Sequence, residues 1–182
     1  MPRAAQAVMS GTADVVVAGG VQAMSQIPIS AAMLAGQAYG FGDPFTGSTG
    51  WVKRFGDGLV TQFNSAEMIA EKWGLSRQDL EQFALNSNER AFRAIDEGRF
   101  DREITPVNGV TMDETPRRGT TLDAMAELQP LQEGGRITAA VSSQTCDAAS
   151  AMLICSEEAV KRYDLKPRAR IHHISVLADD PI

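Results

Sequence analysis

Two short apolar runs of the chain do not alternate with polar positions. They are Asp14–Ala18 and Ala151–Cys155. Uninterrupted apolar runs of this length, bounded by small residues, are typical of strands buried on both faces. We therefore predict that the two runs are neighbouring strands of one sheet. Ile137–Val141 also has the composition of a short strand, and the polar loop Ser142–Ala149 follows it.

Between the first and the later runs, apolar residues recur at helical spacing instead. Ser76 is a typical helix N-cap, and the pattern after it predicts a long helix from Arg77 to about Glu97. Asn64, with Glu67 three residues later, predicts a capping box for the preceding helix, which Gly74 ends. The expected apolar positions of the two helices are Met68, Ile69, Trp73, Leu80, Phe83, Ala84, Ala91, Phe92 and Ile95.

Shorter elements are predicted near both ends of the chain. Ala4–Met9 is rich in helix formers and is followed by Gly11. Ser156 begins a helix with acidic residues in its first turn, and Ala169–Val176 reads as a last strand. Gly19-Gly20, after the first apolar run, is either a tight strand exit or a loop beside a ligand.

Composition excludes several classes of protein. The chain has 182 residues, 43% of them hydrophobic, and a formal net charge of −6. This charge argues against a general binder of nucleic acid or of an anionic membrane surface. No apolar stretch approaches the roughly 20 residues that span a bilayer. The two cysteines, Cys146 and Cys155, lack metal-binding spacing. We therefore expect free thiols in a reducing compartment, which favours a cytoplasmic location.

Two groups of residues suggest chemistry. Arg117-Arg118 lies on a turn ahead of a short helix, where two guanidinium groups suit a phosphate, although two solvated arginines give the same pattern. Cys146 lies in a polar loop, and His172-His173 follows later, so a Cys–His nucleophile is a second hypothesis. Adjacent histidines on a strand point to opposite faces, so at most one can reach that loop. No metal site is expected.

Motifs in order along almost the whole chain resemble the thiolase family. The family comprises acetyl-CoA acetyltransferases and 3-ketoacyl-CoA thiolases, which transfer an acyl group between coenzyme A and an acyl thioester. The segments that carry the resemblance are Ala5–Gly11, Asp14–Ser25, Ser65–Glu67, Phe83–Ser87, Glu97–Ile104, Arg118–Ala126 and Ser143–Ser156.

The resemblance implies an α/β fold, namely part of a core that has αβαβα layers in the whole family. A mostly helical loop domain is inserted into this core. On this basis residues 1–25 belong to the N-terminal core and 26–136 to the inserted loop domain. Residues 137–168 return to the N-terminal core, and 169–182 begin the C-terminal core.

The resemblance also implies a coenzyme A site. Arg117, with help from Arg118, matches the basic position near the adenosine and phosphate end of the ligand. Leu128 and Ala139 match apolar contacts along the pantetheine arm, and Ser143 matches a serine that binds a pantetheine amide. Cys146 stands where the family usually has an asparagine, which favours a structural thiol.

No residue of this chain matches the family's nucleophilic cysteine, its Gly-His-Pro histidine or its second cysteine. We therefore expect an inner portion of a thiolase that has no catalytic residue and is inactive alone. An alternative is a non-catalytic coenzyme A-binding or assembly module, and a third hypothesis is a Cys146-dependent acyltransferase or hydrolase. The implied ligand is coenzyme A or acyl-CoA as a substrate, without a permanently bound cofactor. The implied assembly is a homo-oligomer, dimer or tetramer.

Overall fold

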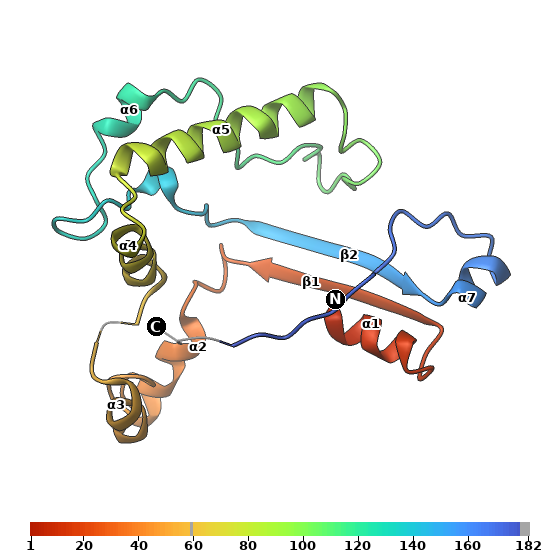
Figure 1. Cartoon of the computed structure of the whole chain (residues 1–182), viewed down its shortest axis with the longest axis horizontal. Helices are drawn as coiled ribbons and strands as arrows, with labels where there is room; N and C mark the ends of the chain where they lie inside the picture. The colour runs from red at the N-terminus through yellow and green to blue at the C-terminus, as the bar shows by residue number, and fades with distance from the viewer. Residues whose placement is uncertain (59, 179–182) are drawn as a thin grey trace. The chain divides into compact units, whose positions relative to one another are not determined.

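The structure is a computed structural model that describes residues 1–58 and 60–178. It contains two compact units, one formed by Met1–Ala31 with Cys146–Ile182 and the other by Ala32–Thr145. Figure 1 shows the helices and strands of both units. The sheet lies in the first unit, and the long helix and all five candidate ligand residues lie in the second. The expected four-segment division of the chain stays a prediction.

The first unit is built on two antiparallel strands, β1 (Val15–Ala23) and β2 (Asp147–Cys155). Val15 pairs with Cys155 and Ala23 with Asp147, so the predicted pairing of the two runs is confirmed, although both strands are longer than expected. Helix α1 (Pro2–Met9) packs on both strands, and its residue Ala5 is buried. Helix α7 (Glu157–Arg162) begins at the predicted cap, Ser156, and packs on β2.

The glycine pair lies inside β1, so both sequence interpretations of a strand exit or a loop were wrong. Gly19 is paired with Ala151, and a Cβ atom added at Gly19 would lie 2.6 Å from the carbonyl oxygen of Ser150. At Gly20 an added Cβ would meet no atom within 4 Å. The first glycine therefore allows the two backbones to approach, which is a packing requirement and not a conformational one.

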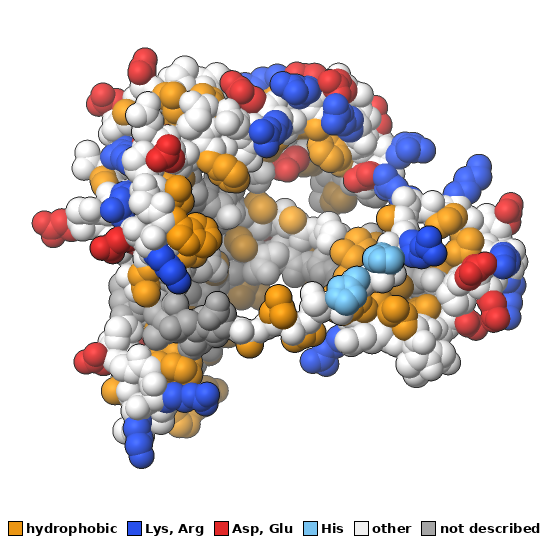
Figure 2. Space-filling model, viewed as in Figure 1, with side chains coloured by type: hydrophobic (Ala, Val, Ile, Leu, Met, Phe, Trp, Pro, Cys, Tyr) orange, Lys and Arg blue, Asp and Glu red, His pale blue; other side chains and the backbone are white. Residues whose placement is uncertain are grey.

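The expected burial of both strand faces was also wrong. Val17 is 71% exposed, Val21 79% and Leu153 50%. Within the described residues the sheet has two strands, and α1 and α7 cover only part of it. Figure 2 shows hydrophobic side chains on the surface of this unit, towards the right of the view. An uninterrupted apolar run predicts a strand with both faces covered. The described residues cover only part of these faces.

The second unit is organised on α5 (Arg77–Asp96), as predicted. The Ser76 side chain accepts from the Asp79 N–H at 3.1 Å, and the Asp79 carboxylate accepts from the Ser76 N–H at 2.8 Å, which completes a capping box. Helix α4 (Gln62–Lys72) precedes α5, but its cap is Thr61, whose hydroxyl accepts from the Asn64 N–H. The predicted capping box of Asn64 and Glu67 was therefore wrong.

The core of the second unit is small and partly polar. Its buried residues are Ala70, Glu81, Ala84, Met125, Ile137 and Thr138. They come from α4, α5, α6 (Leu122–Ala126) and the segment that leads into the 3-10 turn η2 (Ala139–Val141). Several expected core positions are instead exposed, including Phe83 at 75% and Trp73 at 69%. Helical periodicity identified the helices, but it did not identify which apolar positions are covered.

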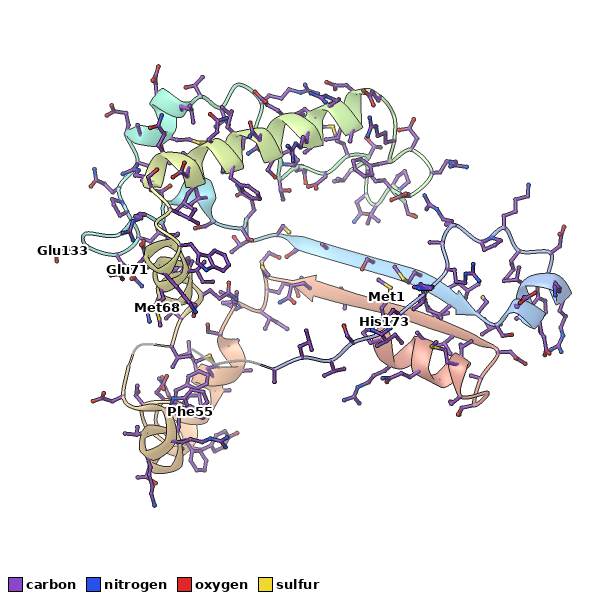
Figure 3. All side chains as sticks on the ribbon, viewed as in Figure 1. Met1, Phe55, Met68, Glu71, Glu133 and His173 are labelled. Carbon is purple, nitrogen blue, oxygen red and sulfur yellow. The ribbon has the colours of Figure 1, made fainter. Side chains whose placement is uncertain are left out.

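Before α4 the chain forms three short elements, α2 (Ala31–Leu34), the 3-10 helix η1 (Ala35–Tyr39) and α3 (Thr49–Phe55). An aromatic cluster holds α3, because the Trp51 ring lies 4.8 Å from that of Phe45 and 4.5 Å from that of Phe55, measured between centroids. Figure 3 shows Phe55 in this part of the molecule.

Two further expected strand segments, Ile137–Val141 and Ala169–Val176, do not form strands. Ile137–Val141 ends in η2 because the Val141 N–H donates to the Thr138 carbonyl. Ala169–Val176 is irregular, and no strand pairs with it among residues 1–58 and 60–178. A strand needs a neighbour for its backbone hydrogen bonds, and composition does not supply one.

None of the described helices has the length and apolar character required to cross a membrane.

Candidate functional site

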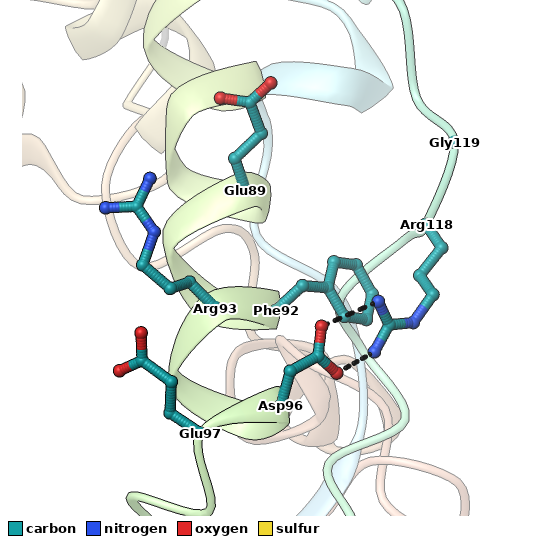
Figure 4. A pocket seen from close by; sticks show the side chains of 7 residues that line it. All are labelled: Glu89, Phe92, Arg93, Asp96, Glu97, Arg118 and Gly119. Carbon is teal, nitrogen blue, oxygen red and sulfur yellow. Dashed lines mark hydrogen bonds and ion pairs between the residues drawn. The ribbon is translucent and has the colours of Figure 1, made fainter.

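The turn that carries the arginine pair lies along α5. The Arg118 guanidinium donates to both carboxylate oxygens of Asp96, with Nη1 3.2 Å from Oδ2, and its Cζ lies 4.1 Å from the centre of the Phe92 ring. Figure 4 shows this pair at the edge of an open hollow that also includes Glu89 and Glu97. The stacked and bidentate arrangement fixes the position of the turn on the helix.

Electrostatics distinguish the two arginines. The hydrogen bonds from Arg118 hold the pKa of the Asp96 carboxyl below its usual value, and the same bonds raise the pKa of Arg118. The fork of Arg118 is thus already used by a carboxylate, and Glu89 and Glu97 line the same hollow. A phosphate that approached Arg118 would have to compete with Asp96 and would meet negative charge. Arg118 is therefore better suited to holding the turn than to binding phosphate directly.

Arg117 has a different environment. Its backbone N–H donates to the Asn88 Oδ1 atom at 3.0 Å, and its carbonyl accepts from the Thr120 hydroxyl at 3.1 Å. These bonds fix the backbone, whereas the side chain is exposed and has no ion pair with any of the residues described. The guanidinium of Arg117 therefore faces solvent and is available to an anionic ligand.

Leu128 lies in a segment that a single arginine holds. Arg77 Nη2 donates to the carbonyls of Met125, Ala126 and Leu128 at 2.9, 3.1 and 2.7 Å, which places a cation at the C-terminal end of α6. Its Nε atom donates to Glu81 at 2.7 Å, and Glu81 is only 4% exposed. The four-residue spacing of Arg77 and Glu81 is a sequence signal for their ion pair. Nothing in the sequence indicated that Arg77 also bonds to carbonyls about 50 positions later.

Ala139 is the first residue of the 3-10 turn η2, and Ser143 follows shortly after the turn. Ala139 and Ser143 are both exposed, and the residue before the turn, Thr138, is fully buried. The Ser142 hydroxyl donates to the Thr138 carbonyl at 2.8 Å, so the turn closes immediately before Ser143. Glu67 of α4 accepts from two backbone N–H groups just before the turn, a role that sequence reasoning missed.

The structure thus places all five candidate residues in the second unit. The arginine pair is fixed on α5 through Asn88 and Asp96, and α6 and η2 also contact α5. Such an arrangement presents a cation, apolar surface and a hydroxyl on one scaffold. These are the groups that a ligand with an anionic nucleotide end and an amide-containing arm requires.

The Cys–His hypothesis gains no geometric support. Cys146 is a half-buried free thiol directly before β2, and His172 and His173 are exposed on the irregular segment after α7. No hydrogen bond joins the thiol to either imidazole in the described part of the chain. A nucleophilic cysteine requires a base within hydrogen-bond reach, so Cys146 has the environment of a structural residue.

Comparison with known proteins identifies the family. Residues 1–158 match the family model described as thiolase, N-terminal domain. The chain is 56% identical over 182 residues to the steroid 3-ketoacyl-CoA thiolase FadA6 of Mycobacterium tuberculosis, covering 98% of this chain and 44% of that protein. It is 36% identical over 196 residues to a beta-ketoadipyl-CoA thiolase of Acinetobacter baylyi, covering 98% and 48%.

A solved structure agrees with these relatives. The acetyl-CoA acetyltransferase from Syntrophomonas wolfei superposes with a TM-score of 0.65 at 37% identity, covering 89% of this chain and 42% of that one. The fold of this chain is therefore part of an α/β core of the thiolase type, as expected. The chain belongs to the thiolase family. It spans less than half the length of the relatives named here.

Proposed function

We propose that this chain forms the coenzyme A-binding part of a thiolase-type acyltransferase. The whole protein would move an acyl group between coenzyme A and an acyl-CoA, by thiolysis of a 3-ketoacyl-CoA or by condensation of acetyl-CoA. The observation that carries the proposal is the common attachment of the Arg117 turn, α6 and η2 to α5. Family membership supplies the class of reaction.

Each candidate residue has a role in this proposal. Arg117 binds phosphate at the nucleotide end, and Arg118 holds the turn in place through Asp96. Leu128 and Ala139 provide apolar contact for the pantetheine arm, and the Ser143 hydroxyl binds one of its amides. Fixing both ends of the ligand would orient the reactive thioester, which lowers the entropic cost of acyl transfer.

The proposal also includes a substrate, an oligomeric state and a location for the whole protein. Coenzyme A or acyl-CoA acts as the substrate, with no permanently bound cofactor. The exposed apolar sheet of the first unit supports a homo-oligomer, dimer or tetramer, in the whole protein, because such surfaces are usually covered by protein. The two free thiols support a cytoplasmic location.

Calorimetric titration of the chain with coenzyme A tests this proposal. Arg117→Ala should weaken binding about tenfold, because a lost charge-assisted bond at an exposed site has a value near the lower end of about 1.5–3 kcal/mol. Ser143→Ala should weaken it only about threefold, since a neutral hydrogen bond is lost. The Arg117 effect should shrink as salt concentration rises.

Arg90→Ala is the matched control, because Arg90 is an exposed arginine on the scaffold helix α5. It removes the same charge from the same unit and should leave affinity nearly unchanged. Equal affinity of Arg117→Ala and wild type at low salt would contradict the assignment of Arg117. No binding by the wild type would contradict the proposed function itself.

A further inference from the structure

Glu67 holds the backbone that leads into η2. Its Oε1 atom accepts from the Arg136 N–H at 2.5 Å and from the Ile137 N–H at 2.6 Å. Its other oxygen, Oε2, lies 3.4 Å from Arg136 Nη1. The Glu67 side chain is only 14% exposed, so these charge-assisted bonds form in a partly desolvated environment.

Gly135 provides the space that this carboxylate occupies. A Cβ atom added at Gly135 would lie 2.6 Å from Glu67 Oε1 and 3.1 Å from the carbonyl oxygen of Gln132. Gly135 does not have a positive φ, so its requirement is one of space and not of backbone conformation. The position of the Glu67 carboxylate therefore depends on Gly135, because a side chain at position 135 would displace that carboxylate.

The held backbone continues directly into the ligand segment. The Ile137 carbonyl accepts from the Leu131 N–H at 2.8 Å, and Thr138 forms a bridge with Pro130. Ile137 and Thr138 are 8% and 0% exposed. Beyond them, η2 and Ser143 emerge at the surface. The turn η2 packs on α5, and the Ser142 hydroxyl bonds back to the Thr138 carbonyl, so the bonds of Glu67 to Arg136 and Ile137 fix the point from which this turn starts.

We propose that Glu67, with Gly135, is a positioning residue that preorganises η2 and Ser143 for the pantetheine arm of coenzyme A. This proposal rests on the proposed function. Glu67 does not touch the ligand in it. Without the carboxylate the turn samples several positions, and the apparent affinity falls in proportion to the fraction of molecules that hold the competent one.

The test compares two ligands that share the nucleotide end of coenzyme A. Coenzyme A carries the pantetheine arm, whereas adenosine 3′,5′-bisphosphate lacks it. Glu67→Ala should weaken coenzyme A binding about tenfold, corresponding to a competent fraction of about one tenth. It should leave binding of adenosine 3′,5′-bisphosphate unchanged. Glu67→Gln keeps an acceptor oxygen for the two N–H groups and should retain most of the affinity.

Two further variants separate positioning from general destabilisation. Gly135→Ala should cause the same selective loss of coenzyme A affinity, because it displaces the Glu67 carboxylate although residue 67 is not substituted. Glu71→Ala is the matched control, because Glu71 is exposed on the same helix one turn later (Figure 3), and it should behave as the wild type. Amide hydrogen exchange should report faster exchange at Arg136 and Ile137 in Glu67→Ala, but not in Glu71→Ala.

The outcomes distinguish this proposal from the proposed function. Wild-type binding of coenzyme A with unchanged affinity in Glu67→Ala and Gly135→Ala would overturn only the positioning role. Equal losses for both ligands would also overturn it, since they would indicate a general effect on folding. No binding of either ligand by the wild type would overturn both proposals.

Discussion

Replacing Arg77 by alanine should destabilise the 32–145 unit by about 3 kcal/mol, at the lower end of the range for breaking a buried ion pair. The change would leave Glu81, whose side chain is 6% exposed, as an unpaired buried carboxylate. It would also remove the donor of the three carbonyls at the end of α6. The lower end applies because the Arg77 side chain is itself 29% exposed. Urea unfolding followed by helical circular dichroism gives the free energy of unfolding.

Two variants show whether the unpaired charge is the cause. Arg90→Ala removes an exposed arginine from α5 and should change stability by less than about 0.5 kcal/mol. Adding Glu81→Ala to Arg77→Ala should recover part of the lost stability, because the uncompensated carboxylate is removed. If Arg77→Ala and Arg90→Ala had the same stability, the role assigned to Arg77 would be wrong.

Gly19→Val should destabilise the first unit by about 3 kcal/mol, the upper end of the usual cost of overpacking. The obstacle is a backbone carbonyl of the partner strand, 2.6 Å from the added Cβ, which cannot rotate away as a flexible side chain does. The expected consequence is separation of β1 and β2 around the pair of Gly19 and Ala151. Thermal unfolding and amide exchange in β2 measure the two effects.

The neighbouring glycine provides the control for this substitution. Gly20→Val adds the same side chain to the same strand, where an added Cβ meets no atom within 4 Å. It should be neutral or stabilising, since valine is favoured over glycine in strands. Similar losses in Gly19→Val and Gly20→Val would indicate that the strands are not paired in this register.

Local signals explain which parts of the fold were predictable from the sequence. The helix starts at Ser76 and Ser156 each depend on bonds formed within four residues, so the sequence identified both caps, although the reciprocal bond from Asp79 was seen only in the structure. Glu67 has the same local spacing from Asn64, but it bonds to Arg136 and Ile137, some 70 positions later. A tertiary partner overrode the local pattern there, and no single sequence shows such a partner.

The sequence predicted some features of the candidate site and missed others. The arginine pair on its turn already suggested a phosphate site, and the resemblance to thiolases assigned Arg117, Arg118 and Ser143 to coenzyme A. It did not show that Asp96, 22 positions before Arg118, occupies the fork of that arginine. The expected burial of β2 and of Phe83 failed because apolar character predicts that a surface needs cover, and not which residues of this chain provide it.

Hydrogen–deuterium exchange of the wild-type chain with and without coenzyme A is the most direct test of the central claim. That claim is that coenzyme A binds across the segments held on α5. The ligand should slow exchange in 117–120 and 139–143 and leave β1 and β2 unchanged. Binding accompanied by protection confined to β1, β2 or α7, with 117–120 and 139–143 unaffected, would contradict the account.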